Sequence, residues 1–130
     1  MRKIFIILIF LIFTVPNALA KHEYPEKVYQ KYWCDKNKGI TEYKLDDGTR
    51  VDCLTDKLAV EFDFAPKWHE CIGQALYYGR KTNKTPACVL ILEKEEDIRF
   101  FNRLKYTVYQ RKNMPYFKTY TVNKCNMSAD

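Results

Sequence analysis

Two apolar stretches with a helix-forming stretch between them place the tightest constraint on the fold of this chain. The first, LAVEFDF at residues 58–64, is rich in Val and Phe, which favour a pleated and buried strand. The second, the continuous apolar run at residues 87–92, also has the character of a buried strand. Residues 68–78 carry apolar side chains at helical spacing, with Pro66 suited to the helix start and Gly79 to its end. A strand, a helix and a strand in this order predict a parallel crossover in one sheet.

Two further strands are expected upstream of this unit. Residues 40–45 and 50–55 flank the sequence DDGT, whose Asp-Gly pair is a strong signal for a tight turn between paired strands. A second tight turn at residues 55–57 leads into the strand LAVEFDF. The sequence therefore predicts an antiparallel three-strand meander that continues into the parallel crossover.

Helices complete the expected architecture. Residues 26–33 have the pattern of a short helix, and residues 97–110 have that of a longer amphipathic helix with Asp97 near its start. Residues 117–122 are a candidate for an additional edge strand. We expect an α/β fold with the order α-β-β-β-α-β-α, in which one mixed sheet is flanked by helices.

The first twenty residues predict an exported protein. Two basic residues precede an apolar run that ends at Val15, and small residues follow near position 20. This arrangement is typical of a secretory signal peptide with a cut before Lys21, and the run is shorter than the roughly 20 apolar residues that a membrane anchor needs. We expect residues 1–20 to be removed and residues 21–130 to form a single domain that is periplasmic or secreted.

Five cysteines follow the predicted leader, and an exported protein meets an oxidising compartment. Up to two disulfides are therefore expected, which leaves one thiol. Pairing of Cys34 with Cys125 would tie the first helix to the C-terminal tail, but spacing alone does not fix the connectivity. A structural zinc site is not expected, because the sequence has no CxxC pair and only two histidines.

Asp52, Glu61 and Asp63 fall within twelve residues of strand-like sequence. Side chains alternate across a strand, so Glu61 and Asp63 share one face of residues 58–64, and the preceding turn can bring Asp52 opposite them. Carboxylates gathered beside apolar residues repel one another and are poorly hydrated. A divalent cation such as Mg²⁺ removes this repulsion, because it prefers oxygen ligands and keeps room for water and phosphate.

The same acids have a second interpretation. Acidic side chains on a strand can simply face solvent on an uncovered side of the sheet, paired with Lys44 or Arg50 on a neighbouring strand. The alternation rule alone permits both interpretations.

The stretch as a whole resembles the core of the PD-(D/E)xK nuclease superfamily, to which many restriction endonucleases and Holliday-junction resolvases belong. The likeness spans about residues 26–109 and includes the order of the elements as well as the acids: a hairpin with an Asp, a short turn, a strand with a Glu, and a helix. The resemblance implies that Asp52 and Glu61 hold Mg²⁺ or Mn²⁺. It further implies an auxiliary acid, supplied by Glu42 or Glu26.

Three more positions complete the site that the resemblance implies. Gln74 would approach the metal from the helix. The family has a Lys two residues after its second acid, whereas this chain has Asp63. Either Asp63 binds the metal or orients water through its oxygen, or Lys67 supplies the missing ammonium, since its long side chain can reach back from the helix start. A degenerate site is the third reading of this departure.

Basic residues near the end of the helix at 68–78 are the first candidates for contact with phosphate. They are Arg80, Lys81 and Lys84. A second basic region is formed by Arg99, Arg103, Lys105, Arg111 and Lys112. Both regions are also compatible with solvated helix faces, so the sequence leaves their role open.

These observations predict an exported, Mg²⁺- or Mn²⁺-dependent endonuclease that hydrolyses DNA phosphodiester bonds. The alternative is a catalytically inactive exported binding protein on the same fold, stabilised by disulfides. Export favours this alternative, because most nucleases of this type act inside cells. Many of them act as dimers, but the sequence shows no interface signal and leaves the oligomeric state open.

Overall fold

The computed structural model describes residues 22–109 and 116–128 and contains both the meander and the crossover. The strands are β1 (Ile40–Lys44), β2 (Arg50–Leu54), β3 (Leu58–Phe64), β4 (Thr85–Ile91) and β5 (Lys118–Val122). The helices are α1 (Glu26–Lys36), α2 (Trp68–Thr82), α3 (Ile98–Tyr109) and α4 (Lys124–Met127), with 3-10 turns η1 (Ala65–Lys67) and η2 (Glu95–Asp97). The predicted α/β class and the order of elements are confirmed. The short helix α4 was not expected from the sequence.

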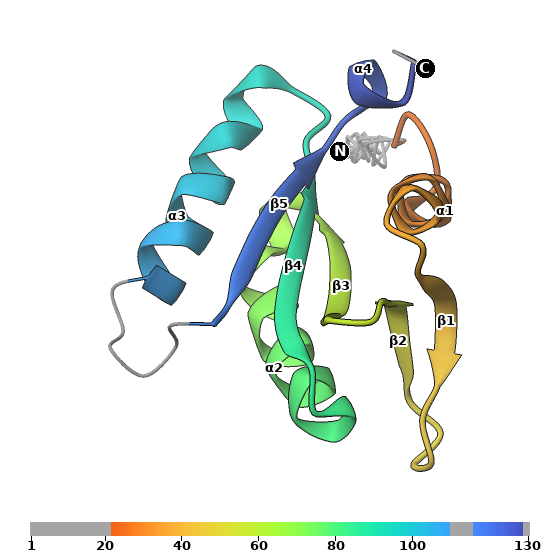
Figure 1. Cartoon of the computed structure of the whole chain (residues 1–130). Helices are drawn as coiled ribbons and strands as arrows, with labels where there is room; N and C mark the ends of the chain where they lie inside the picture. The colour runs from red at the N-terminus through yellow and green to blue at the C-terminus, as the bar shows by residue number, and fades with distance from the viewer. Residues whose placement is uncertain (1–21, 110–115, 129–130) are drawn as a thin grey trace, which may run out of the picture.

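The five strands form one mixed sheet in the order β1-β2-β3-β4-β5 (Figure 1). The pairs β1–β2 and β2–β3 are antiparallel, while β3–β4 and β4–β5 are parallel. The parallel pair β3–β4 is in register from Leu58–Thr85 to Phe64–Ile91, and α2 makes the connection between the two strands. The predicted meander, crossover and edge strand are therefore confirmed.

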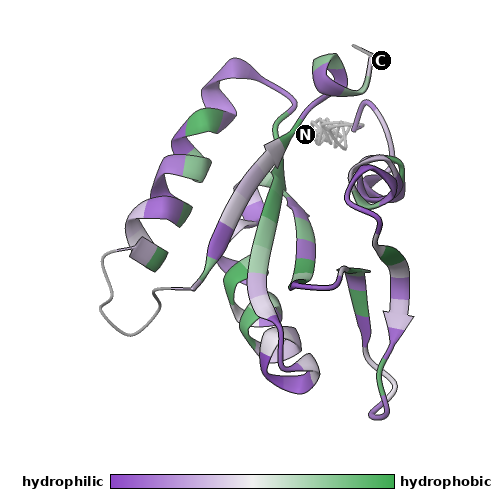
Figure 2. Cartoon of the chain, viewed as in Figure 1, coloured by the Kyte–Doolittle hydropathy of each residue, from purple (hydrophilic) through white to green (hydrophobic). Residues whose placement is uncertain are grey.

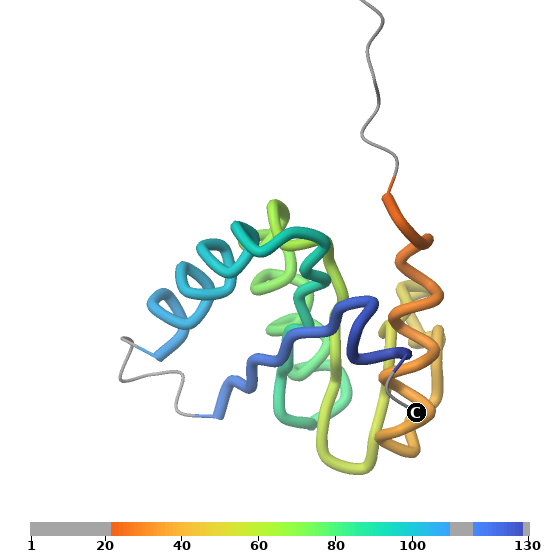
Figure 3. The backbone as a smooth tube through the Cα atoms, turned by 90° about the horizontal axis from the view of Figure 1, so that it is seen from above, coloured from red at the N-terminus to blue at the C-terminus, as the bar shows by residue number. Residues whose placement is uncertain are grey.

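Hydrophobic side chains fill both faces of the sheet. Val60 and Phe62 of β3 lie in a core with α1, and Figure 2 shows the hydrophobic character of the neighbouring β4. On the opposite face, Cys88 and Leu90 of β4 contact α2 and α3. Seen from above, α1 and α3 lie on opposite sides of the central strands (Figure 3). The strand alternation thus leaves Glu61 on the face opposite Phe62.

Helix α2 continues past Gly79, where the sequence predicted its end. The helix closes at Asn83, which has a left-handed φ of 54°, and the Lys84 N–H donates to the Gly79 carbonyl at 3.0 Å. Gly79 is needed for another reason: a Cβ there would lie 3.0 Å from both the Lys84 carbonyl oxygen and the Pro86 Cβ. The prediction was wrong because this glycine permits close approach of β4 instead of ending the helix.

Two disulfides bind helices to the sheet, one on each face. Cys34 of α1 is bonded to Cys53 of β2 with a Cα–Cα distance of 5.7 Å, and Cys71 of α2 is bonded to Cys88 of β4 at 5.9 Å. The predicted number of disulfides is confirmed. The predicted Cys34–Cys125 pair is wrong, because β2 brings Cys53 directly beneath α1, while Cys125 is exposed and free.

Several predictions fall on parts of the chain that the structure does not describe. The predicted leader at residues 1–20 lies outside the described ranges, as do Arg111 and Lys112. Within 22–109 and 116–128, no helix has both the length and the apolar character required to cross a membrane.

Candidate functional site: an acidic cluster where two strands separate

The candidate site lies where β2 and β3 move apart. The ladder between these strands consists of the pairs Cys53–Val60 and Leu54–Ala59. Next to it, the carboxylate of Asp52 accepts a hydrogen bond of 2.8 Å from the Phe62 N–H. A side chain therefore takes the place of a backbone acceptor and satisfies a strand donor. The separation of the two strands is visible in Figure 1.

This separation brings the predicted acids together in a buried position. Glu61 and Asp63 are each only 6% exposed, Asp52 is half-buried, and burial together with the charge of Asp52 raises the pKa of Glu61. The Glu61 Oε2 atom is buried and has no hydrogen-bond partner in the described part of the chain. The solvent-facing interpretation, with Lys44 or Arg50 as partner, is wrong for Glu61 and Asp63.

Burial shifts the protonation of all three acids. It raises the pKa of Asp63 to about 7, with a further contribution from the negative charge of Glu26. Burial also raises the pKa of Asp52 to about 7, although the hydrogen bond from the Phe62 N–H acts against this. The pKa of Glu61 is raised furthest, first by burial and then by the charges of Asp52 and Asp63. Without a cation, the cluster therefore retains protons near neutral pH.

The two predicted auxiliary acids differ in availability. Glu26, in the first turn of α1, faces the cluster, and burial raises its pKa. Glu42 of β1 accepts a hydrogen bond from the Gln30 amide at 3.2 Å and forms an ion pair with Arg50 at 3.5 Å. Glu42 also has a left-handed φ of 55°, a strained conformation for a residue inside a strand. Because Arg50 already balances Glu42, Glu26 is the more available acid.

Lys67 is placed near the cluster, whereas Gln74 is not shown to contact it. Lys67 lies exposed in η1, and its positive charge lowers the pKa of both Asp63 and Glu26. Gln74 is exposed on α2, and no recorded contact of the described residues joins it to the acids. The expectation from the family that Gln74 approaches the site stays a prediction.

Helix α2 contributes two residues that the sequence did not assign to the acid cluster. Glu70 in its first turn raises the pKa of Asp63. Tyr78 is 8% exposed, and burial followed by the charges of Glu61 and Asp52 raises its pKa to about 12. The sequence signal was weak, because only the docking of α2 shows that Tyr78 is buried and that Glu70 is near enough to act on Asp63.

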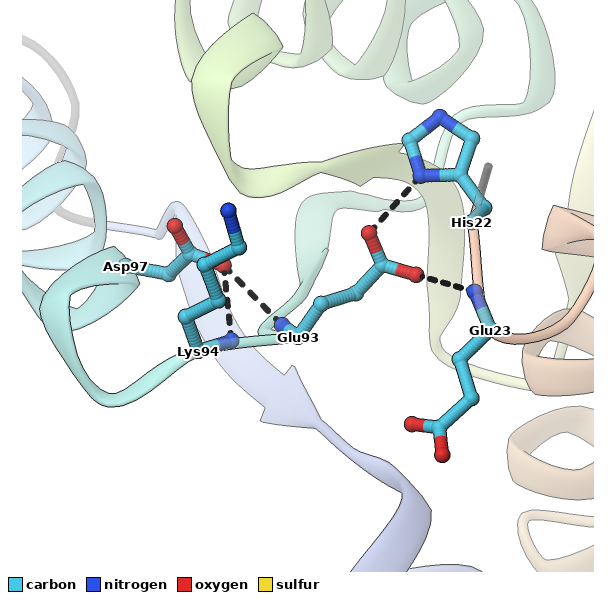
Figure 4. Close-up of polar contacts among 5 residues, drawn as sticks. All are labelled: His22, Glu23, Glu93, Lys94 and Asp97. Atoms are coloured by element: carbon cyan, nitrogen blue, oxygen red, sulfur yellow. Dashed lines mark hydrogen bonds and ion pairs between the residues drawn. The ribbon is translucent and has the colours of Figure 1, made fainter. Parts of the chain in front are cut away.

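The segment that leads into α1 is anchored to the residues that follow β4 (Figure 4). Both carboxylate oxygens of Glu93, which follows β4, are engaged: one lies 2.7 Å from His22 Nδ1, and the other accepts from the Glu23 N–H at 2.8 Å. The His22 ring also stacks on Phe64 with centroids 3.5 Å apart. These contacts fix the start of α1 and hence the position of Glu26.

The predicted phosphate-contacting patch is largely engaged within the chain. Lys81 forms ion pairs with Asp46 at 2.7 Å and Asp47 at 3.8 Å, in the turn between β1 and β2. The Lys84 ammonium donates to the Asp56 carbonyl oxygen at 2.7 Å. Arg80 is exposed. Lys81 and Lys84 therefore have structural roles, and the binding role of this patch stays a prediction.

Asp52 and Glu61 are the residues of the cluster to examine as ligands of a hard cation. Among the described residues, no group of three or more His, Cys, Asp or Glu side chains is arranged to hold a metal ion as it stands. However, Mg²⁺ is commonly held by one or two carboxylates, with water and substrate phosphate as its other ligands. The adjacent carboxyls of Asp52 and Glu61, with the unpartnered Oε2 of Glu61, meet that smaller requirement.

Comparison with known proteins gives a partial likeness. The chain is 35% identical over 72 residues to a KilA-N domain-containing protein of Acanthamoeba polyphaga mimivirus. The aligned part covers 55% of this chain and 20% of the viral protein, so the chain matches about a fifth of that relative's length. No protein-family model matches the chain, and no solved structure matches it.

Proposed function

We propose that this chain is a metal-dependent endonuclease with a restriction-endonuclease-like core, acting on DNA phosphodiester bonds. The observation that carries the proposal is the pair of the half-buried Asp52 and the buried Glu61, in which Glu61 Oε2 has no partner in the described chain. The sheet order β1-β2-β3-β4 with a parallel β3–β4 pair supports it, as does the position of the acids where β2 and β3 separate. This is the arrangement that the PD-(D/E)xK resemblance implies.

In this proposal the carboxyls of Asp52 and Glu61 hold Mg²⁺ or Mn²⁺. Such a cation lowers the pKa of an attacking water and stabilises negative charge on the phosphate oxygens. Binding also relieves the repulsion between the two acids, because both can then be ionised. The cluster would be more stable with the cation than without it.

The remaining polar residues have separate tasks in the proposal. Asp63 has a pKa of about 7 and lies beside Glu61, so it can accept a proton from water at neutral pH. Lys67 brings positive charge to the edge of the cluster, where it can attract a phosphate and stabilise the charge that develops on it. Glu26 is the auxiliary acid.

The test is a plasmid-nicking assay with the purified, oxidised protein and Mn²⁺. We expect nicking by the wild type and none by the Asp52→Asn, Glu61→Gln double variant. The matched control is a Glu95→Gln, Glu96→Gln double variant, which loses the same two charges from exposed positions in η2. It should nick plasmid like the wild type.

The same assay also tests the alternative function, a non-catalytic binding protein. If the wild type neither nicks plasmid nor binds Mn²⁺ in a calorimeter, the chain is a non-catalytic binding protein on this fold. The observation that favours this alternative is Asp63 itself, since a carboxylate cannot offer the positive charge that the family's Lys gives to the transition state. Equal nicking by the wild type and the Asp52→Asn, Glu61→Gln variant would instead exclude the acid cluster as the catalytic site.

A further inference from the structure

Helix α3 presents two faces of opposite character. Phe101, Leu104 and Val108 are directed into the core, and the last two are fully buried. Since successive residues of a helix are about 100° apart, Arg99, Arg103 and Tyr106 lie on the face diametrically opposite. All three are exposed, and Tyr106 has 69% of its surface accessible. This outer face therefore contributes nothing to the core.

The cations of α3 are among the described basic residues that form no ion pair with an acid. Arg99, Arg103 and Lys105 are the charged residues of α3, so the helix itself carries no acid. No ion pair within the described chain involves them, whereas other cations are paired: Lys31, Arg50, Lys81 and Lys124. Glu95 and Glu96 precede the helix in η2, at the end near Arg99. Of the two arginines on the outer face, Arg103 is therefore the one farther from these acids.

The two arginines are held in place by an aromatic ring. The guanidinium carbons of Arg99 and Arg103 lie 4.7 and 5.5 Å from the centre of the Phe100 ring. Contact with a ring face restricts the planar guanidinium groups while leaving N–H donors for an outside acceptor. Arg99 and Arg103 are also separated by about one helical turn, roughly 6 Å along the axis. The helix therefore offers two pre-positioned anion-binding groups in a row.

We propose that the outer face of α3, formed by Arg99, Arg103 and Tyr106 and flanked beside Tyr106 by Lys105, binds single-stranded nucleic acid. The cations match the phosphates of the backbone, and the exposed Tyr106 ring offers a surface on which an unpaired base can stack. The proposal rests on the proposed function for the class of partner, but it does not require that the acid cluster cleaves anything. In this proposal the cations of α3, which form no ion pair among the described residues, bind phosphate in place of Lys81 and Lys84, which are engaged within the chain.

The position of α3 relates this surface to the acid cluster. Helix α3 contacts η1, the turn that ends at Lys67. Lys67 in turn lies near Asp63 and Glu26, whose pKa values its charge lowers. Helix α3 and Asp63 therefore both lie near the end of the sheet at which β3 leads into η1. The surface deepens the proposed function by assigning the place where the substrate is held.

The experiment measures the binding of a fluorescent oligodeoxythymidine by anisotropy, in EDTA so that cleavage plays no part. The Arg99→Gln, Arg103→Gln, Lys105→Gln variant should bind on the order of tenfold to a hundredfold more weakly, and its salt dependence should fall by about 2 in log–log slope. The control is Lys27→Gln, Lys44→Gln, Lys57→Gln, which removes three exposed charges elsewhere. It should lose less than about threefold.

The outcomes separate this inference from the proposed function. Equal losses of oligonucleotide affinity in the α3 variant and in the lysine control would show that only net charge matters and would overturn the inference. Absence of binding by the wild type, or equally effective competition by poly-glutamate, would also overturn it. A Tyr106→Ala variant should weaken binding to the oligonucleotide more than binding to a duplex of the same length, and the reverse order would count against a single strand. Loss of binding in the α3 variant with unchanged Mn²⁺ binding would support this surface independently of catalysis.

Discussion

Neutralising one buried acid, by Glu61→Gln, should stabilise the fold above neutral pH when divalent cations are absent. Glu61 is 6% exposed, and its Oε2 has no hydrogen-bond partner among the residues described. A charge at this position would be neither hydrated nor paired, and it would repel Asp52 and Asp63. Glutamine keeps nearly the same shape and cannot ionise.

The sign of the pH dependence follows from the raised pKa values. The ordinary pKa of Glu is 4.5, so above this pH the unfolded chain releases a proton that the folded chain retains. Stability therefore falls as pH rises from the unfolded pKa toward the folded one. For Asp63 this window runs from 3.8 to about 7. The wild type should lose stability between about pH 5 and about pH 8, and Glu61→Gln should lose less.

The magnitude can be bounded. At about pH 8, keeping a proton on a group whose unfolded pKa is 4.5 costs nominally about 5 kcal/mol, since one pKa unit corresponds to about 1.4 kcal/mol. Relaxation, water entry and sharing of protons between Asp52 and Glu61 reduce this figure, so we expect Glu61→Gln to gain about 1 to 3 kcal/mol. The exposed control Glu95→Gln should change stability by less than about 0.5 kcal/mol.

The assay is urea unfolding in EDTA, followed by the fluorescence of Trp33 and Trp68, at several pH values. The midpoint and slope of each transition give the free energy of unfolding. A wild-type stability that is flat or rises over this pH range would refute the reasoning, as would a Glu61→Gln variant that is less stable than the wild type at about pH 8.

Three further changes have directions that the structure fixes. Gly79→Ala should lower the free energy of unfolding by about 1 to 3 kcal/mol, because its Cβ would press on β4. Gly73→Ala should raise the free energy of unfolding by about 0.5 to 1 kcal/mol, because a Cβ at this position meets nothing within 4 Å. The midpoints of urea unfolding measure both changes, and equal effects of the two variants would contradict the account. Cys34→Ser should cost about 2 to 4 kcal/mol and Cys125→Ser almost nothing, with peptide mapping of the oxidised protein as an independent check. Asp63→Lys, which restores the family's residue, should raise the nicking rate on the order of tenfold or more, and an inactive variant that still binds Mn²⁺ would argue against the family mechanism.

Local patterns predicted the meander and the faces of its strands. The alternation in residues 58–64 placed Phe62 in the core and Glu61 on the opposite face, because the period of a strand leaves no other choice once one face is buried. The Asp-Gly turn and the apolar run of β4 were equally local signals. The neighbouring positions of β1, β2 and β3 followed from the short turns between these strands.

The features that the sequence did not predict correctly depend on contacts between segments that are distant in the chain. Gly79 carries a helix-ending signal, but its close approach to Pro86 is set by how α2 docks on β4. The pairing of Cys34 with Cys53 likewise required the position of α1 over β2. The effect of Glu70 on Asp63 was missed for the same reason, since it depends on where α2 docks.

Calorimetric titration of Mn²⁺ into the oxidised protein tests the central claim most directly. The account predicts binding by the wild type, release of protons from the acids at about pH 7, and loss of both signals in the Asp52→Asn, Glu61→Gln variant. The Glu95→Gln, Glu96→Gln control should bind like the wild type. Absence of binding by a folded wild type, or equal binding by the Asp52→Asn, Glu61→Gln variant, would contradict the claim that these buried acids form a cation site.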